Sequence, residues 1–272
     1  GLGTFTETET GNVRNEFDGG NCDLSGISPT SSFRLIIQGE TQFTGSPLRY
    51  TDGGRVLFNG ASEQFRVNTG VNYVTIQNLA VKKTATYETI LITVGTRLGL
   101  VLKNLLLQDE HSGAFGGLSI SSDGNATLEN ITHIRTAGSS HGITSSSGNH
   151  TFKNCGTIAL AGSAGTGWRR SPYGSPIAIN CYAYGYTTDW SATGWDTTNS
   201  KNNATDKASG SSNVPGSGTA QFEITSSEWE SLTGGSHDLR VASGSTKLKN
   251  NGAASGGTTT DIEVLPREVP TT

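Results

Sequence analysis

The chain has 272 residues, and its 37 glycines, lack of methionine and charged content of only 15% are an unusual composition. Long amphipathic helices need Ala, Leu, Glu and Lys at a 3.6-residue period and are therefore excluded, which favours an all-β chain with many turns. The 19 basic and 23 acidic residues give a net charge of −4, with no basic run longer than Arg169-Arg170, so neither nucleic acid nor a membrane is expected as a partner.

The first segment, residues 1–32, is polar and surrounds Cys22. We expect it to cap an open end of the fold. Three short apolar runs follow it, at Phe33–Ile37, Val56–Phe58 and Gln64–Val67. Because they are rich in branched and aromatic residues and are separated by turn residues, they are interpreted as an irregular first rung of a repeat.

A repeat with one asparagine per unit dominates the middle of the chain. The asparagines are Asn78, Asn104, Asn130, Asn154 and Asn180, at spacings of 26, 26, 24 and 26 residues, with apolar or small residues two before and one after each. This period, with its Gly and β-branched content, predicts a parallel β-solenoid. Equivalent residues of stacked rungs lie about 4.8 Å apart. The asparagines should therefore form a ladder with a structural role, because each side-chain amide can donate to the next.

The strand after each asparagine can be resolved further. Alternation directs the first and third residues beyond the asparagine inward and the second and fourth outward. The outward set is too apolar for a solvated face, so we expect another chain or a terminal segment of this one to cover it. Its large members in the middle and late rungs are Leu106, Ile134, Ile158, Tyr182 and Tyr184.

Charged residues also recur in register. Lys83, Asp109 and Arg135 each lie five residues beyond an asparagine, which predicts a stack of alternating sign. We interpret it as a partly exposed ion ladder that helps to fix strand register. The alternative is that Asp109, Glu110 and His111 form the acid/base cluster of a hydrolase.

The histidine and cysteine residues inside the repeat are expected to have structural roles. His133 occupies an inward position and is expected to be a hydrogen-bonded core histidine. Cys155 and Cys181 occupy stacked inward positions, where two packed thiols are favoured over a disulfide because parallel side chains seldom reach the required dihedral angle. No His/Cys pair stands at zinc spacing, so no metal site and no cofactor are predicted.

Aromatic residues gather near the end of the repeat. Tyr182, Tyr184 and Tyr186 alternate with small residues, so all three rings are expected to face outward. Such residues anchor protein interfaces and also stack on sugars, so an interface, a cover formed by the C-terminal segment and contact with a surface glycan remain alternatives. The same surface is expected to include Trp168, Arg169, Arg170, Tyr173, Trp190 and Trp195.

These patterns divide the chain into three parts. Residues 1–32 form the N-terminal cap, residues 33–195 form the solenoid, and residues 196–272 form strands and turns that close its other end. Residues 196–220 are the polar, Gly/Ser-rich start of that closing segment.

The repeat resembles the right-handed parallel β-helix of the pectate-lyase-like superfamily, in which an Asn ladder lies in the turn between the second and third sheets. Ser46–Tyr50, Val71–Leu79, Asp238–Ser245 and Thr260–Arg267 are similar to segments of a subgroup common among bacteriophage virion proteins, although Glu263-Val-Leu replaces a glycine-containing stretch of that subgroup. The resemblance covers roughly residues 33–267. It implies a single-stranded right-handed β-helix with irregular caps, while fold alone does not fix function.

In the lyase relatives, one sheet carries the substrate groove. Here that sheet would comprise Thr89–Val94, Gly117–Ser121 and Gly142–Ser145. A calcium-assisted lyase needs converging carboxylates and a strong base, and these strands offer neither. Their outward residues would be Leu91, Thr93, Ser119, Ser121 and Thr144.

Three functional hypotheses follow. The first is a non-enzymatic bacteriophage virion structural protein, such as a head decoration, fibre or tail component. It would act as a rigid assembly or attachment module on the virion surface, in contact with other virion proteins or further copies of itself. The second is a polysaccharide-binding or polysaccharide-degrading enzyme, a lyase or depolymerase. The third is a bacterial surface adhesin, secreted or held at the cell surface.

Overall fold

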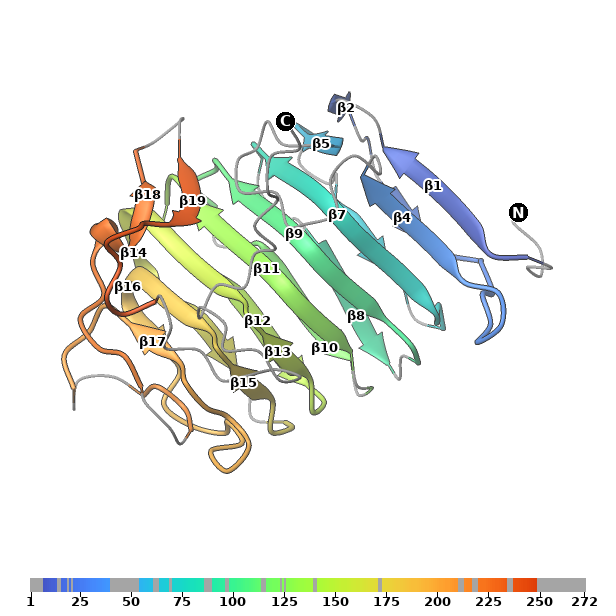
Figure 1. Ribbon diagram of the computed structural model, residues 1–272. Helices are drawn as coiled ribbons and strands as arrows, with labels where there is room; N and C mark the ends of the chain where they lie inside the picture. The colour runs from blue at the N-terminus through green and yellow to red at the C-terminus, as the bar shows by residue number, and fades with distance from the viewer. Residues whose placement is uncertain are drawn as a thin grey trace.

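The computed structural model shows an all-β chain whose parallel strands stack as a solenoid of about six turns (Figure 1). Among the residues that the structure describes, one continuous parallel sheet of 17 strands winds round the molecule, and a separate two-stranded antiparallel sheet follows it in the C-terminal segment. The structure describes residues 7–13, 16–18, 20, 22–39, 54–60, 64–68, 70–85, 90–95, 98–113, 116–122, 124, 126–138, 141–170, 173–209, 213–216, 220–233 and 237–248.

The wound sheet presents three faces, which we call A, B and C in the order in which each rung visits them. Several strands bend through the corner between faces A and B, so their first half lies on A and their second half on B. Face A is formed by β1 (Glu9–Val13), β4 (Leu35–Gly39), the first halves of β7 (Val74–Lys83), β9 (Val101–Asp109) and β11 (Thr127–Arg135), and then β13 (Thr151–Lys153) and β15 (Ile177–Ile179).

Faces B and C complete each rung. Face B contains β2 (Glu16–Asp18), β5 (Gly54–Phe58), the second halves of β7, β9 and β11, the starts of β14 (Gly156–Arg170) and β16 (Tyr182–Trp190), and β17 (Ala204–Thr205). Face C contains β3 (Cys22–Leu24), β6 (Phe65–Val67), β8 (Ile90–Gly95), β10 (Leu118–Ser122), β12 (Ile143–Ser147) and the ends of β14 and β16.

The solenoid begins earlier than the sequence indicated. β1, β2 and β3 pair in register with β4, β5 and β6, so these three N-terminal strands form a rung of their own. The boundary at residue 33 is therefore corrected. The three apolar runs expected to form an irregular first rung are strands β4, β5 and β6, and they form the second rung. Ser46–Tyr50 and Thr260–Arg267 lie outside the described residues.

The Asn ladder is confirmed at the corner between faces A and B. All five asparagines adopt a left-handed backbone conformation, with φ between 52° and 55°, which Asn tolerates better than most residues. From Asn104 onward, each side-chain amide donates to the side-chain oxygen of the preceding asparagine: Asn104 to Asn78 at 2.8 Å, Asn130 to Asn104 at 2.9 Å, Asn154 to Asn130 at 3.2 Å and Asn180 to Asn154 at 3.0 Å. The ladder thus satisfies polar groups at a bend that the β-ladder does not reach.

A second set of side chains ties the turns between faces C and A to the next rung. The Asn72 side-chain oxygen accepts a hydrogen bond from the Leu98 backbone amide at 2.9 Å, and Asn149 accepts from Ser175 at 2.8 Å. Both bonds join residues 26 apart, which is one rung of the solenoid. Two of the three corners are therefore fastened vertically by asparagine.

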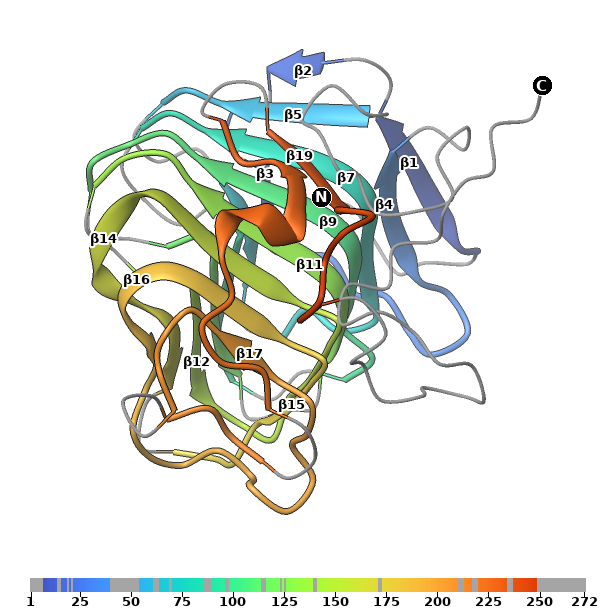
Figure 2. The same cartoon turned by 60° about the vertical axis from the view of Figure 1, so that its left-hand side comes forward.

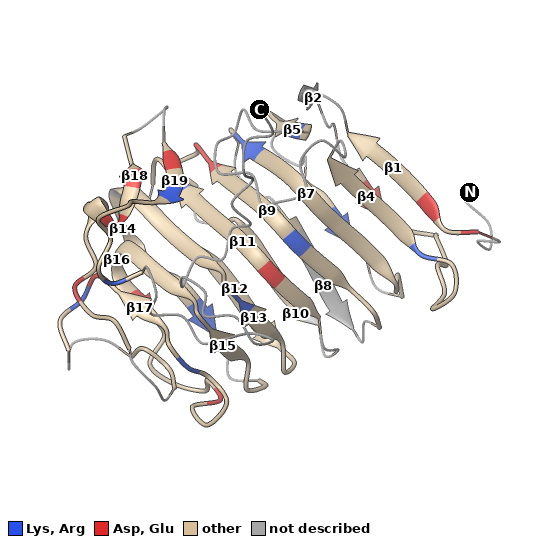
Figure 3. Cartoon of the chain, in the orientation of Figure 1, with Lys and Arg blue, Asp and Glu red and all other residues tan. Residues whose placement is uncertain are grey.

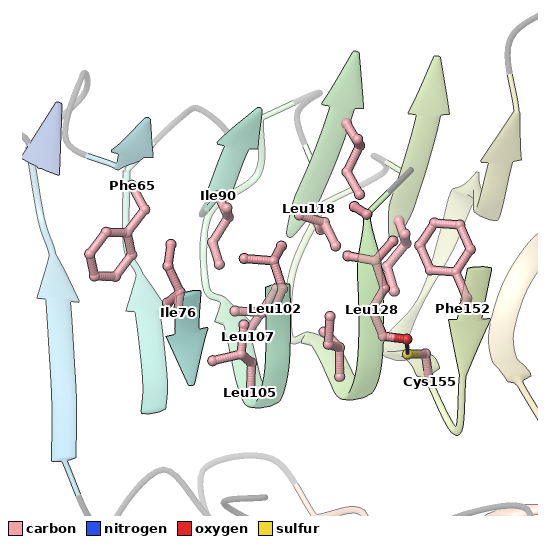
Figure 4. Close-up of a cluster of buried hydrophobic side chains, with 14 of the residues drawn as sticks. Phe65, Ile76, Ile90, Leu102, Leu105, Leu107, Leu118, Leu128, Phe152 and Cys155 are labelled. Atoms are coloured by element: carbon pink, nitrogen blue, oxygen red, sulfur yellow. Dashed lines mark hydrogen bonds between the residues drawn. The ribbon is translucent and has the colours of Figure 1, made fainter. Parts of the chain in front are cut away.

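The core runs along the inside of the solenoid as stacked apolar columns (Figure 4). Leu102, Leu128 and Phe152 occupy one inward column of face A, and Ile90 and Leu118 occupy one of face C. Cys155 and Cys181 are buried free thiols, as predicted. Burial raises the pKa of the Cys155 thiol well above its ordinary value, which keeps that thiol protonated.

The C-terminal end of the core is filled by tryptophan rings. Trp168 and Trp190 stack with their ring centroids 5.1 Å apart and planes 6° apart, and Trp195 meets Trp190 edge-on at 5.3 Å. Beyond them, Lys201 and β17 continue the rung pattern, and Gln221 forms a bridge with Ala204. The N-terminal rung lies at the opposite end of the molecule (Figure 1).

Candidate functional site

Five polar side chains form a cluster inside the solenoid, which we call the inner polar cluster. It consists of Asp109, His133, Arg135, Thr157 and Tyr186, each at most 1% exposed. They come from four successive rungs, on β9, β11, β14 and β16. Because buried charges need partners, the hydrogen bonds within this cluster decide whether it stabilises the fold.

The inner polar cluster is held by a continuous chain of hydrogen bonds. Asp109 Oδ2 lies 2.9 Å from His133 Nε2 and 3.7 Å from Arg135 Nη1. His133 Nδ1 lies 3.0 Å from Thr157 Oγ1, which is 2.8 Å from the Tyr186 hydroxyl. Burial raises the pKa of Tyr186 above its ordinary value, and burial lowers that of Arg135 although Asp109 opposes the shift. His133 is a hydrogen-bonded core histidine, as predicted.

Three glycines make room for the cluster. Gly117, Gly142 and Gly167 stand one residue before successive inward apolar residues of face C. A Cβ on Gly117 would overlap the His133 ring, and one on Gly142 would overlap the Thr157 hydroxyl. The glycine column on one face is thus the steric counterpart of the polar column on another.

The expected ion ladder has the predicted register but not the predicted environment. Lys83 stands opposite Asp109, and Asp109 opposite Arg135, in the register of neighbouring strands. All three side chains are fully buried rather than partly exposed. The fifth residue beyond each asparagine continues the inward alternation of the first and third, which places the charges inside. Lys83 Nζ donates to the Gly60 carbonyl at 2.8 Å.

The sequence of groups in the cluster, a carboxylate, an imidazole and a hydroxyl, is the arrangement that activates a nucleophile in hydrolases. Here the order is Asp109, His133 and Thr157, and none of the three side chains has any exposed surface. Arg135 also donates to the backbone carbonyls of His111 and Gly113, at 3.1 and 2.7 Å. These contacts tie the strands to their loops, so the geometry favours a structural role.

The side chains of the other two members of the suspected acid/base cluster have hydrogen-bond partners outside the inner polar cluster. Glu110 is partly exposed and pairs with Lys82 at 2.8 Å, while Gln108 donates to the same carboxylate oxygen at 2.6 Å. His111 accepts a hydrogen bond from the Gly113 amide at its Nδ1 atom, and burial lowers its pKa. The structure therefore separates Asp109, Glu110 and His111 into different environments.

Several aromatic residues expected to face outward lie inside. Trp168, Trp190 and Tyr186 are at most 1% exposed, and Trp195 is 7% exposed. For Tyr186 the reason is Gly185, whose φ of 81° breaks the alternation in the same way as the ladder asparagines do, and Gly162, with a φ of 68°, is the left-handed residue before Trp168 on β14. An outward residue is then followed, after one left-handed residue, by an inward one. The strand register places Trp168 and Trp190 in the inward column of face C that contains Ile143.

Two residues of the expected aromatic surface are accessible. Tyr173 is 72% exposed and Arg169 is also exposed. Arg170 is half-buried, and its guanidinium donates to the Gly174 carbonyl. These residues do not form a continuous aromatic surface with the buried tryptophans.

The apolar outer column of face B is covered by the chain's own C-terminal segment. The column contains Leu106, Ile134, Ile158 and Tyr182, which have no exposed surface, and the half-buried Tyr184 packs beside them. The covering segment contains 3-10 helix η1 (Ser226–Glu228) and strands β18 (Trp229–Ser231) and β19 (Asp238–Val241), and Figure 2 shows it lying across β9, β11, β14 and β16. Its apolar contacts come from Ile224, Trp229, Leu239 and Leu248. Of the alternatives, the cover formed by the C-terminal segment is therefore the one present.

Glu228 anchors this covering segment. Its buried carboxylate accepts hydrogen bonds from the Ser245 hydroxyl at 2.5 Å and from the backbone amides of Lys247 and Leu248 at 3.1 and 3.3 Å. Tyr182 in turn lies over Gly156, where any Cβ would overlap its ring. The covering segment thus contacts face B through apolar side chains and is held together internally by the hydrogen bonds of Glu228.

Face C presents the outward residues that the groove comparison named. Ser119, Ser121 and Thr144 are half-buried, and Ser119 and Thr144 each stand between two buried residues and point away from the core. The side chains of Leu91 and Thr93 lie outside the described part of the chain. Within the described residues there is no group of three or more His, Cys, Asp or Glu residues that could hold a metal ion, and no helix long and apolar enough to cross a membrane.

A pair of carboxyl groups escaped the sequence reasoning. Asp189 is 2% exposed, and its Oδ2 accepts a hydrogen bond from the Asp206 amide at 3.1 Å and another from the Thr205 hydroxyl. Burial, followed by the hydrogen bond to the Asp206 carboxyl, raises the pKa of Asp189 to about 8. The spacing of Asp189 and Asp206 in the sequence does not predict the pair. The two carboxyl groups meet only because the chain folds back at the last rung.

Comparison with known proteins does not assign the chain to a family. No protein-family model matches the chain, and neither a curated protein nor a solved structure was found to be similar to it.

Proposed function

We propose that this chain is a non-enzymatic structural component of a bacteriophage virion, such as a head decoration, fibre or tail protein. In this role the solenoid is a rigid module on the virion surface. It assembles with other virion proteins or serves in attachment of the virion. The proposal extends the resemblance of Val71–Leu79 and Asp238–Ser245 to segments of virion β-helices.

The main observation in its favour is the placement of Asp109. This residue is the carboxylate on which the hydrolase alternative depends, and it is sealed inside the solenoid against His133 and Arg135. A general acid or nucleophile must come within hydrogen-bond reach of its substrate. A buried and neutralised carboxylate instead stabilises neighbouring rungs, as a load-resisting scaffold requires.

The architecture adds further support. Long-range parallel pairing, two fastened corners and a covered face B favour a stiff body whose equivalent residues repeat along one axis. Repeat proteins of this kind expose extended surfaces, on which contacts can recur at each rung.

The test is to locate the chain in its native source. Particles purified from that source are digested for peptide mass spectrometry and labelled with gold-conjugated antibody against the chain for electron microscopy. We expect peptides of the chain at a fixed stoichiometry and label confined to one part of the head or tail. Detection of the chain only as a free protein, with no particle labelled, would contradict the proposal.

An activity assay separates the enzymatic alternative. The purified chain is incubated with acidic and neutral polysaccharides, and release of reducing or unsaturated ends is followed. We expect no release. Cleavage that is lost in Glu110→Gln, the accessible carboxylate beside Asp109, would favour a depolymerase instead.

A further inference from the structure

The outer surface of face A has a regular charge pattern that nothing above explains. The residue before each ladder asparagine points outward, and the register of the strands stacks these residues in one column. The column begins with amides at Asn12, Gln38 and Gln77 and continues with Lys103, Glu129, Lys153, Ile179 and Lys201. We call it the outer column.

The first part of the outer column is an amide ladder. Gln38 Nε2 donates to Asn12 Oδ1 at 2.9 Å, and Gln77 Nε2 donates to Gln38 Oε1 at 2.6 Å. These side chains are exposed or half-buried. Amides and hydroxyls both donate and accept hydrogen bonds, which suits them to a ligand rich in hydroxyl groups.

The second part of the outer column carries lysine at every second rung. Lys103, Lys153 and Lys201 are separated by Glu129 and Ile179, so neighbouring lysines stand two rungs apart. At about 4.8 Å per rung, their spacing is roughly 10 Å. Figure 3 shows the basic and acidic segments of β9 and β11 side by side on this part of the molecule.

A parallel column supplies hydroxyl and β-branched side chains. Two residues before the outer column stand Thr75, Val101, Thr127, Thr151 and Ile177, which the register also stacks. Together the two columns make a face about two side chains wide that runs along the solenoid axis. An extended, unbranched polymer is the shape that fits such a face.

We propose that face A binds an extended acidic polysaccharide with one carboxylate in each disaccharide. The length of an extended disaccharide matches the spacing of the lysines. Thr127 and Thr151 in the parallel column, and the amides that precede Lys103 in the outer column, are complementary to sugar hydroxyls. Duplex nucleic acid fits less well, because it carries a charge every 1.7 Å or so along its axis, far more densely than the lysines recur.

Register fixing alone does not account for the pattern. The ion pair between Lys153 and Glu129 is 3.5 Å long, and both side chains are 38% exposed, so it contributes little to stability. Lys201 stands opposite Ile179, where an apolar or uncharged residue would serve the fold equally well. The proposal concerns a ligand of the chain and stands or falls separately from membership in a virion.

The test measures binding of three polymers to the full chain: hyaluronan, with one carboxylate per disaccharide, polygalacturonate, with one per sugar ring, and neutral dextran. We expect hyaluronan to bind most tightly and dextran least, with affinity falling as salt is raised. The double variant Lys103→Gln/Lys201→Gln should bind hyaluronan about tenfold more weakly, because two exposed charge contacts are lost.

The control is Lys82→Gln/Arg66→Gln, which removes two positive charges as well, one on the face B half of β7 and one on β6 of face C, and should bind as the native chain does. Glu129→Gln should bind hyaluronan more tightly, because it removes the one carboxylate of the outer column. Melting temperatures of all variants exclude a folding defect. The proposal is overturned if dextran or duplex DNA binds as tightly as hyaluronan, or if the two double variants weaken binding equally.

Discussion

Two stacks of charge with the same alternation of sign run along this molecule in opposite environments. Lys83, Asp109 and Arg135 lie inside the solenoid without exposed surface, whereas Lys103, Glu129 and Lys153 lie on face A. Buried charges must be paired and hydrogen-bonded, because removing one partner leaves another uncompensated. Exposed pairs are solvated whether or not they meet. The same strand register therefore produces both stacks, but the buried stack contributes more to the free energy of unfolding than the exposed one.

The largest expected effect comes from breaking the inner stack. Asp109→Ala should lower the free energy of unfolding by about 3–5 kcal/mol, because His133 and Arg135 lose their buried carboxylate partner. Glu129→Ala, the matched change in the outer stack, should cost at most about 1 kcal/mol. Urea unfolding followed by circular dichroism measures both. Equal losses would show that burial does not distinguish the two stacks.

A second change acts on the space around the inner polar cluster. Gly142→Ala should destabilise the chain by about 1–3 kcal/mol, because the added methyl group would overlap the Thr157 hydroxyl and strain the surrounding strands. Gly244→Ala is the control, since no atom lies within 4 Å of the added carbon, and its effect should stay within about 0.5 kcal/mol. Similar thermal shifts for both variants would count against close packing of the cluster.

The loss of stability expected from breaking the Asn ladder lies between the losses expected for the buried and the exposed charge stacks, because the ladder asparagines are half-buried or buried. Asn130→Ala should cost about 1–3 kcal/mol, since it leaves Asn104 and Asn154 each without one hydrogen-bond partner. Asn199→Ala removes an exposed contact to Asp196 and should cost no more than about 0.5 kcal/mol. Melting temperatures compare them, and a loss at Asn199 as large as that at Asn130 would contradict the ladder's role.

The carboxyl pair at the last rung gives a gradual effect, a dependence of stability on pH. The folded pKa of Asp189 is about 8, and an aspartate in an unfolded chain titrates near about 3.9. The folded state thus holds a proton that the unfolded state releases. This contribution is complete below about pH 4, is lost progressively as pH rises to about 8, and is then constant.

Asp189→Asn should remove this slope, because an amide does not titrate. The measurement is the difference in unfolding free energy between the native chain and the variant at a series of pH values from about 5 to about 9. The difference should shift steadily against the native chain and level off near pH 8. A difference that does not change with pH would show that Asp189 is ionised in the folded state throughout.

The sequence was sufficient for the repeat and its register. The spacing of Asn78 to Asn180 identified the corner between faces A and B, and alternation placed His133 and Cys155 inside correctly. The N-terminal rung was missed because residues 9–24 are polar and carry no ladder asparagine. Its strands are recognised only by their pairing with β4, β5 and β6.

The errors at the late rungs have one physical origin. Counting alternate residues works until a residue adopts a left-handed conformation, and Gly185 does so within what reads as a continuous strand. Tyr186 and Trp190 were therefore assigned to the wrong side. The column of Gly117, Gly142 and Gly167 was a usable signal for the inner polar cluster, since bulky polar residues on one wall require small residues on another.

The tryptophan-filled end has a spectroscopic consequence. All four tryptophans of the chain lie between residues 168 and 229, on the last rungs and on the segment that covers face B. Their fluorescence therefore reports on the C-terminal part of the molecule alone, while the strand signal in circular dichroism averages over every rung. If the N-terminal rungs separate first on heating, the chain will lose ellipticity while its emission spectrum stays that of the native protein.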